Sequence, residues 1–301
     1  MNIQPLCELQ MEPKKGYRPY VPSASGLVYC TGKLFVISDE ENSIAVFDSF
    51  PGKGKWLEII PGSLPEEKRA RKAAKSDWEG ISLLPVGIFK KGHSLLLVPS
   101  GSKSHRVKGA LLGLGADGNL TGESSLVDFS AIYEALRIKD INVEGFVIQG
   151  SEAILFHRGN GSAGVCLVIR IRTTDFFDSL LGGKPFSKSG VIKQTKIVGG
   201  DIEGAPLTVT DACALRDGRL LCTLAAEGGD STYEDGEVAG SAIGILEVDD
   251  SLSLLTTIEG TLKLEGVTLT QEGSNSIEGL LCSDADDRET PSQIFSFKID
   301  R

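Results

Sequence analysis

The strongest constraint on the fold is a pattern that recurs five times along the chain. Each copy begins with a polar residue and a small residue, continues as an apolar strand, turns, and returns as a second apolar strand. The leading polar positions are about 54 to 67 residues apart, and they are Ser25, Glu79, Glu144, Asp211 and Glu265. Internal repeats of roughly this length, made of short strands, are typical of β-propellers, in which each repeat forms one blade.

Two more strand-like segments follow in each repeat, so each repeat predicts a four-stranded blade. In the first repeat they are residues 43–47 and 56–60. The last repeat supplies three strands, ending at 293–299, and the N-terminal segment 3–9 can add the fourth. This closure joins the two ends of the chain and removes an open sheet edge. We therefore expect an all-β fold, a five-bladed β-propeller spanning residues 1–301 as a single domain.

A six-bladed propeller is the alternative, with the extra blade inside residues 100–140 or 173–205. Both segments contain a stretch with helical spacing of apolar residues, 129–136 and 176–181, and we expect short helices in loops there. A basic cluster at residues 68–72, with Lys75, predicts a solvated loop or a short helix. Long amphipathic helices do not follow the strands, which argues against a doubly wound α/β fold.

Composition restricts the partners and the environment. A net charge of −10 argues against nucleic acid and acidic membrane surfaces as partners, and it permits cations. No apolar run approaches the roughly 20 residues of a membrane helix. Six scattered cysteines without zinc-site spacing predict buried free thiols and a reducing compartment. Since no signal-peptide pattern is visible, we expect a cytoplasmic protein, and a monomer because a closed ring can fold alone.

In a propeller the innermost strand of each blade lines a central channel. The loop that enters this strand and the turn that follows the second strand lie on the same face of the ring. The leading polar positions should therefore converge there with residues that follow the second strands. This second set comprises Asp39, Ser100, Lys103, His157, Arg158, Asn160, Glu227 and Asp284. Carboxylates crowded near one axis raise one another's pKa unless a cation, basic side chains or protons compensate them.

Two interpretations of the carboxylates are open at this level. In the first, a metal site forms, because a hard divalent ion such as Ca²⁺ takes six to eight oxygen ligands. Its ligands would be Glu79, Glu144, Asp211 and Glu265. In the second, the acids form ion pairs with Lys103, Arg106, Arg158 and Arg288.

Catalytic candidates at this face are His157 and Asp39, either of which could take a proton from water. The candidate substrate-binding residues are Ser100, Lys103, Arg158, Asn160, Glu227 and Asp284. Two functions fit equally well: a metal-dependent hydrolase, and a non-catalytic propeller that binds a small molecule or a protein segment. Whether the protein is an enzyme is left open.

Two strand starts, Asp77-Trp78-Glu79-Gly80 and Asn142-Val143-Glu144-Gly145, resemble the D-x-E-G/A blade signature of phytase-like esterase propellers and related bacterial propellers. The loop at 97–106 is similar to a Ser-Gly-Ser loop of that related group. The resemblance implies a central-channel site, Ca²⁺, and hydrolysis of phosphoesters, esters or lactones. No cluster of Lys and Arg suited to a highly phosphorylated substrate is evident, so phytase activity itself is not expected.

Overall fold

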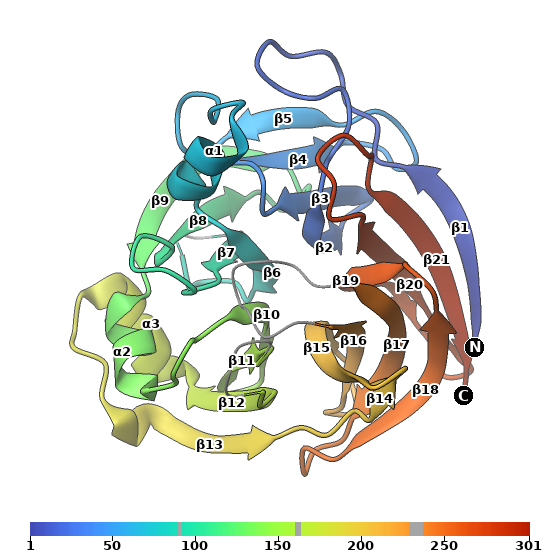
Figure 1. Cartoon of the computed structure of the whole chain (residues 1–301). Coiled ribbons are helices and arrows are strands. Elements are labelled where there is room, and N and C mark those ends of the chain that lie inside the picture. Colours follow the sequence, from blue (N-terminus) through green and yellow to red (C-terminus); the bar gives the residue numbers. More distant parts are fainter. Residues whose placement is uncertain (90–91, 160–163, 229–236) are drawn as a thin grey trace.

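The computed structural model describes residues 1–89, 92–159, 164–228 and 237–301. Five antiparallel sheets stand in a ring, with the inner strands β2, β6, β10, β15 and β19 around its centre (Figure 1). This arrangement confirms the all-β fold and the five blades. The sequence places the inner strands correctly because each one combines a polar start with an apolar run, a pattern that a strand facing both a channel and its neighbouring blades requires.

The first three blades follow the chain order. Blade 1 contains β2 (Ala24–Cys30), β3 (Lys33–Ser38), β4 (Ser43–Phe47) and β5 (Lys55–Glu58). Blade 2 contains β6 (Trp78–Leu84), β7 (His93–Pro99), β8 (Lys108–Leu114) and β9 (Leu120–Asp128). Blade 3 contains β10 (Val143–Gln149), β11 (Glu152–His157), β12 (Leu167–Arg172) and β13 (Val191–Lys196).

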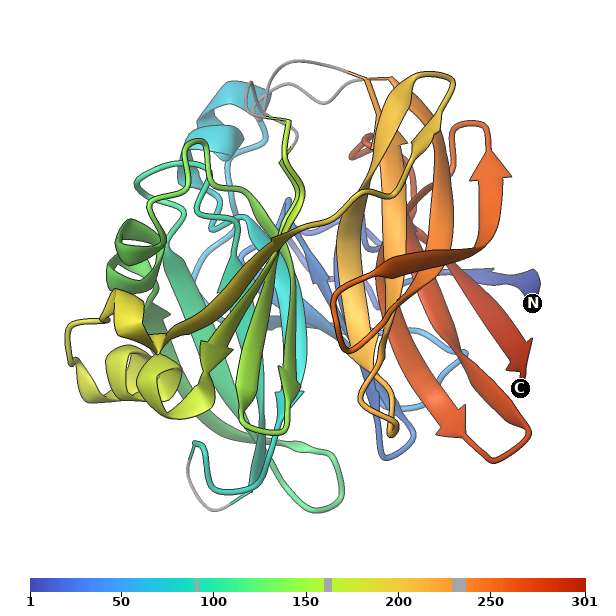
Figure 2. The same ribbon diagram turned by 90° about the horizontal axis from the view of Figure 1, so that it is seen from below.

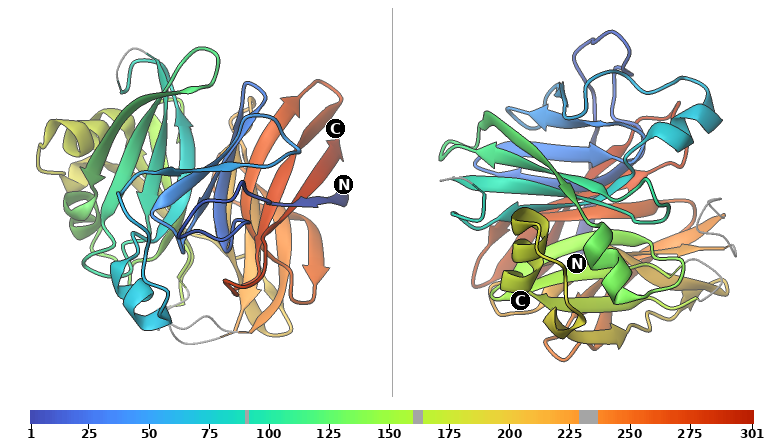
Figure 3. Two further views of the ribbon diagram at one scale, coloured as in Figure 1. Left: turned by 90° about the horizontal axis from the view of Figure 1, so that it is seen from above. Right: turned by 90° about the vertical axis from the view of Figure 1, so that its left-hand side faces the viewer.

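The last two blades complete the ring. Blade 4 contains β15 (Ala205–Ala214), β16 (Leu220–Glu227), β17 (Val238–Leu246) and β18 (Leu252–Glu259), with the short β14 (Asp201–Ile202) added beside β15. Blade 5 contains β19 (Lys263–Glu272), β20 (Ser276–Asp284), β21 (Gln293–Asp300) and the N-terminal β1 (Asn2–Glu8). β1 pairs antiparallel with β21, so the termini lie side by side (Figure 3) and the predicted closure is confirmed.

Helices occupy the connections. The two predicted helices are α2 (Ser130–Leu136) and α3 (Thr173–Gly182), and a 3₁₀ turn covers Lys188–Gly190. They pack outside blades 2 and 3, where Phe176 contacts Phe129 and Phe146 with ring centroids 6.0 and 5.3 Å apart. Residues 100–140 and 173–205 are thus used by β8, β9, β13, β14 and the helices, and the described residues form no sixth blade.

The basic cluster forms α1 (Lys68–Ala74), which lies on the face of the ring where the inner strands begin (Figure 2). The expectation of a solvated segment is wrong for two of its cations. Arg71 is 1% exposed and Lys75 is 4% exposed, because both turn toward carboxylates of the ring. Over the described part of the chain, no helix has the length and apolar character needed to cross a membrane.

Five apolar clusters fill the spaces between neighbouring blades. Leu27, Cys282 and Ile294 form part of the cluster between blades 5 and 1. Burial of such clusters, at about 25 cal/mol per Å² of apolar surface, stabilises the ring. All six cysteines are free thiols, as expected, but only Cys166, Cys222 and Cys282 are buried, whereas Cys7, Cys30 and Cys213 are half-buried.

Candidate functional site

Every inner strand has a β-bulge near its start, at the same place in each blade. The pairing with the second strand shifts between Ala24 and Gly26, and likewise in the other four blades. A bulge leaves one residue outside the ladder and turns its side chain. The five bulge residues, here called the bulge ring, are Ser25, Glu79, Glu144, Thr210 and Glu265.

The fourth member of this ring differs from the sequence prediction by one residue. Thr210 takes the position that the sequence pattern assigns to Asp211. Its Oγ1 donates to the carbonyl of Leu264 at 2.8 Å, just as Ser25 Oγ donates to the carbonyl of Trp78 at 2.7 Å. In both cases the acceptor precedes the glutamate of the next blade, so the two hydroxyls are equivalent.

Asp211 instead occupies the position that is glycine in the other blades. Its Oδ2 accepts a hydrogen bond from Val267 N at 3.0 Å, and the residue does not line the central cavity. A Cβ on Gly145 would lie 3.0 Å from the Cα of Asp211, and one on Gly266 would lie 3.1 Å from the Cα of Gly26. The small residues after the bulge therefore let the inner strands of neighbouring blades come into contact.

Two further levels of side chains surround the channel mouth. Two residues before each bulge stand Ser23, Asp77, Asn142, Thr208 and Lys263. On the second strand of each blade, one residue pairs with the residue just before the bulge. The residues that directly follow this partner are Asp39, Ser100, Arg158, Ala225 and Asp284. Members of all three levels line a cavity of about 320 Å³, together with residues of α1 and of the loop at 284–289.

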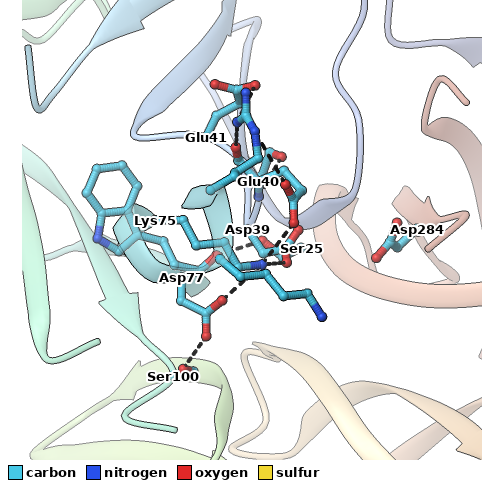
Figure 4. Close-up of polar contacts among 12 residues, drawn as sticks. Ser25, Asp39, Glu40, Glu41, Lys75, Asp77, Ser100 and Asp284 are labelled. Atoms are coloured by element: carbon cyan, nitrogen blue, oxygen red, sulfur yellow. Dashed lines mark hydrogen bonds and ion pairs between the residues drawn. The ribbon is translucent and has the colours of Figure 1, made fainter. Parts of the chain in front are cut away.

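Lys75 is the centre of the charge cluster between blades 1 and 2 (Figure 4). Its Nζ pairs with Asp39 and lies 3.1 Å from both Glu40 Oε1 and Asp77 Oδ1. Arg106 Nη1 donates to Asp77 Oδ2 at 2.7 Å. Burial raises the pKa of Asp77, but Lys75 and Arg106 outweigh burial and the pKa ends below its usual value.

Arg158 and Lys263 form a second cluster, among carboxylates of blades 3, 4 and 5. Arg158 pairs with Glu227 and lies 3.6 Å from Glu144 and 3.8 Å from Glu265. Lys263 Nζ lies 3.1 Å from Glu265 and 2.7 Å from Asp286. Burial is the largest effect on Glu144 and raises its pKa to about 8, although Arg158 opposes it.

Glu79 and Asp284 face the cavity with no ion pair to any described residue. Burial, followed by the nearby Glu144, raises the pKa of Glu79 well above its usual range. Burial also raises the pKa of Asp284, which stands across the channel from Lys75 (Figure 4). Asp39 is near enough to both carboxyls for its charge to raise their pKa values. Burial raises the pKa of Asp39 itself to about 7, although the charge of Lys75 opposes this shift.

Oxygens of Asp39, Asp77 and Glu79 come within 4.8 Å of one another. Asp39 Oδ1 is buried and accepts no hydrogen bond from a described residue. Carboxylate oxygens grouped in this way suit a hard divalent cation. The donor set therefore fits Ca²⁺, with Asp39 and Asp77 as members that the sequence did not assign to the metal.

His157 and Ser100 do not reach the cavity. The ring of His157 is 2% exposed, and its Nδ1 accepts from Asn142 N at 3.0 Å. Burial lowers the pKa of His157, and its hydrogen bond goes to the backbone of Asn142 and not to a carboxylate that could orient a catalytic base. Ser100 is fully buried and donates to Asp77 Oδ2 at 2.5 Å.

The remaining candidates are distributed around the site. Arg158 and Asp284 line the cavity, whereas Glu227 lies behind Arg158 and Lys103 is exposed outside it. Asn160 lies outside the described residues. Sequence reasoning missed Asp77, Lys263 and Lys75. The signal for the first two is their common place two residues before the bulge, while Lys75 reaches the site from α1 and has no counterpart in the repeat.

Stability of the metal-free protein should rise when the pH falls from 8 to 5.5. The raised folded-state pKa values of Asp39 and Glu144, about 7 and 8, mean that the folded chain binds more protons than the unfolded chain in this window. The free energy of unfolding should therefore increase by on the order of 1 kcal/mol per carboxyl. Below about pH 4 the sign reverses, because the pKa of Asp77 and of Asp250 is lowered in the folded state.

Urea unfolding in EDTA, followed by the fluorescence of Trp56 and Trp78, measures this profile. Glu144→Gln removes one titrating carboxyl and should make the profile flatter. An unfolding free energy that stays level or increases from pH 5.5 to 8 would contradict the assigned pKa directions.

A family model described as a family of unknown function, DUF6929, matches residues 20–299. A comparison with curated proteins found no match. Among solved structures, glutaminyl cyclase of Myxococcus xanthus is similar with a TM-score of 0.49 and 10% identity, over 99% of this chain and 97% of that one.

A luciferin-regenerating enzyme is similar with a TM-score of 0.46 and 10% identity, over 98% of this chain and 94% of that one. The PQQ-bound aldose sugar dehydrogenase of Streptomyces coelicolor is similar with a TM-score of 0.43 and 13% identity, over 99% of this chain and 98% of that one. Identities this low concern the fold alone. The resemblance of the blade signature to phytase-like propellers is not confirmed by these matches.

Proposed function

We propose, from the premise that the chain belongs to the DUF6929 family of unknown function, that it is a Ca²⁺-dependent hydrolase of small phosphoesters, esters or lactones. One observation carries the proposal. Glu79 and Asp284 face a polar cavity without an ion pair to any cation in the described part of the chain, beside Asp39, whose pKa is raised to about 7. Partly buried carboxyls of this kind are expected where a cation or a reacting proton belongs.

In this proposal the oxygens of Asp39, Asp77 and Glu79 hold the cation. A bound Ca²⁺ would polarise an ester or phosphoryl oxygen of the substrate. Asp284 accepts a proton from the attacking water, since burial has made its carboxylate more basic. Arg158 and Lys263 keep the carboxylates of blades 3 to 5 in place on the opposite wall.

The cavity also limits the substrate class. Its volume of about 320 Å³ is near the lower end for small-molecule sites, about 300 to 1,000 Å³. The cations Lys75, Arg106, Arg158 and Lys263 are each paired with carboxylates. The described lining carries eleven acidic residues against eight basic ones, which disfavours a highly phosphorylated compound, so a neutral or singly charged ester or lactone fits best.

Addition of Ca²⁺ to EDTA-treated protein should raise the melting temperature by about 5 °C at a hundredfold excess over the Kd, with a smaller rise for Mg²⁺. A panel of p-nitrophenyl acetate, p-nitrophenyl phosphate and a small lactone should then show Ca²⁺-dependent turnover. Glu79→Gln keeps the shape and removes the charge, so it should abolish both effects. Glu123→Gln, on the exposed β9, is the matched control and should leave both effects intact. Undiminished turnover in Glu79→Gln would remove this assignment.

The second candidate is a non-catalytic propeller that binds a cationic small molecule in the same cavity. It is favoured by the positions of His157 and Ser100, which the cavity does not expose to a substrate. In that case amines or Ca²⁺ would raise the melting temperature while the whole panel stayed unhydrolysed.

A further inference from the structure

Lys75 lies where a bound cation would be expected. Its Nζ is within ion-pair distance of Asp39, Glu40 and Asp77, and its side chain is 5% exposed. Two of these three acids belong to the group whose oxygens suit a divalent ion. A lysine is ordinarily charged at neutral pH, and three carboxylates at ion-pair distance favour the ammonium form here. The protein therefore already carries a monovalent cation at this site.

The ammonium can leave without moving a blade. Lys75 belongs to the connection between blades 1 and 2, directly after α1. Its backbone is fixed by the bond from Lys75 N to Arg71 O, and the next residue by the bond from Ser76 N to Asn42 Oδ1, both 2.9 Å. The helix itself is held by Arg106, whose Nη2 donates to the carbonyl of Lys72 at 3.1 Å. Four flexible methylene groups separate this fixed backbone from the charge.

A divalent ion bound by Asp39 and Asp77 would repel the ammonium of Lys75, because both cations would occupy the same carboxylates. Exchange of the ammonium for Na⁺ or K⁺ would bring no additional charge, whereas exchange for a divalent ion would add one. The uncompensated Glu79 beside them can take up that additional charge. A displaceable ammonium therefore discriminates against monovalent ions.

We propose that Lys75 is a built-in counter-ion that a divalent cation displaces, and that it determines both the affinity of the site and its preference for divalent ions. This inference rests on the cation site of the proposed function. Lys75 acts by occupying the carboxylates and has no role in proton transfer.

Calorimetric titration of Ca²⁺ into Lys75→Met tests the inference, because this change keeps the length of the side chain and removes its charge. The Kd should become about tenfold lower than in the unchanged protein. The melting temperature in EDTA should drop and be restored by Ca²⁺, and Na⁺ should now give part of this restoration. Arg69→Met, on the exposed side of the same helix, should keep the Kd within about twofold.

Each result separates this inference from the proposed function. Equal Kd values for the unchanged protein and Lys75→Met would overturn the counter-ion role and leave the metal site standing. Binding to Lys75→Met alone would support the counter-ion role and refute Ca²⁺ dependence of the natural protein. Absence of binding in both would overturn both.

The unchanged protein offers a second readout that does not depend on folding of a variant. Reductive methylation followed by mass spectrometry should find Lys75 protected in EDTA and reactive once Ca²⁺ is bound. Equal protection of Lys75 in both conditions would show that the ammonium stays in place, and the inference would fail.

Discussion

Replacement of Arg158 by leucine is expected to lower the free energy of unfolding at pH 7.5 by about 3 to 5 kcal/mol. Arg158 is 3% exposed and lies among Glu144, Glu227 and Glu265, of which Lys263 also pairs with Glu227 and Glu265. Without the guanidinium, one ammonium would face three buried carboxylates. Removal of one partner from a buried ionic cluster is costly because the remaining charges are only poorly solvated.

The pH dependence identifies the cause of this loss. On acidification to pH 5.5 Glu144 and Glu265 of Arg158→Leu take up protons, since burial and mutual repulsion raise their pKa, and the difference from the unchanged protein should become smaller. Arg172→Leu in the same blade removes an exposed pair with Asp175 and should cost less than about 1 kcal/mol. Urea unfolding curves at the two pH values provide the measurement. Similar losses in the two variants, or a loss independent of pH, would contradict the buried cluster as the cause.

The repeat predicted the five blades and the ring closure because both follow from short-range patterns. The inner strands share one local pattern, which is a polar residue, a small residue and then an apolar run. The ring closure followed because blade 5 lacked a fourth strand and segment 3–9 could supply it. The one-residue difference in blade 4 has a physical origin. Asp211-Ala212 imitates the Glu-Gly pairs of the other blades, and only the hydrogen-bond register reveals that Thr210 is the bulged residue.

The compensating cations could be predicted less well. Arg158 follows its strand directly, so the repeat places it at the channel mouth. Lys75 enters from a helix between two blades, and its contact with Asp39 spans 36 positions of sequence without any repeat to indicate it. His157 lies at the strand position that is Ser38, Pro99 and Ser283 in other blades, where the side chain is buried. The sequence alone makes a histidine in that position look like a catalytic base, but its burial keeps it from the cavity.

The site is therefore asymmetric although the blades repeat. Blades 2, 3 and 5 place glutamates on the bulge ring, while Ser25 and Thr210 bind the backbone of the next blade. Among the described residues, cations form ion pairs with Glu144 and Glu265, whereas none does so with Glu79. The carboxyls left without an ion pair to a described residue are Glu79 and Asp284, and this asymmetry follows from the residues that break the repeat.

Replacement of Gly266 by valine should destabilise the protein by about 3 kcal/mol or more, because it affects the contact that closes the ring. A Cβ at this position would lie 2.6 Å from Leu27 Cδ2, 2.7 Å from Cys282 Sγ and 3.1 Å from the Cα of Gly26. The leucine methyl can turn away, but the backbone of blade 1 and the buried sulfur cannot do so without separating blades 5 and 1. The expected result in urea unfolding is a lower midpoint with an unchanged slope.

Gly182→Ala is the matched control, since a Cβ at the end of α3 would have its nearest neighbour, Lys184 Cγ, at 4.0 Å. Alanine there should be neutral or slightly stabilising, within about 1 kcal/mol, because it favours the helix. If Gly266→Val unfolded at the same urea concentration as the unchanged protein, the inner strands of blades 5 and 1 could not be in contact at the bulge. The same separation would displace Asp284 of blade 5 relative to Asp39 of blade 1, so Gly266→Val should also reduce Ca²⁺-dependent turnover, whereas Gly182→Ala should not.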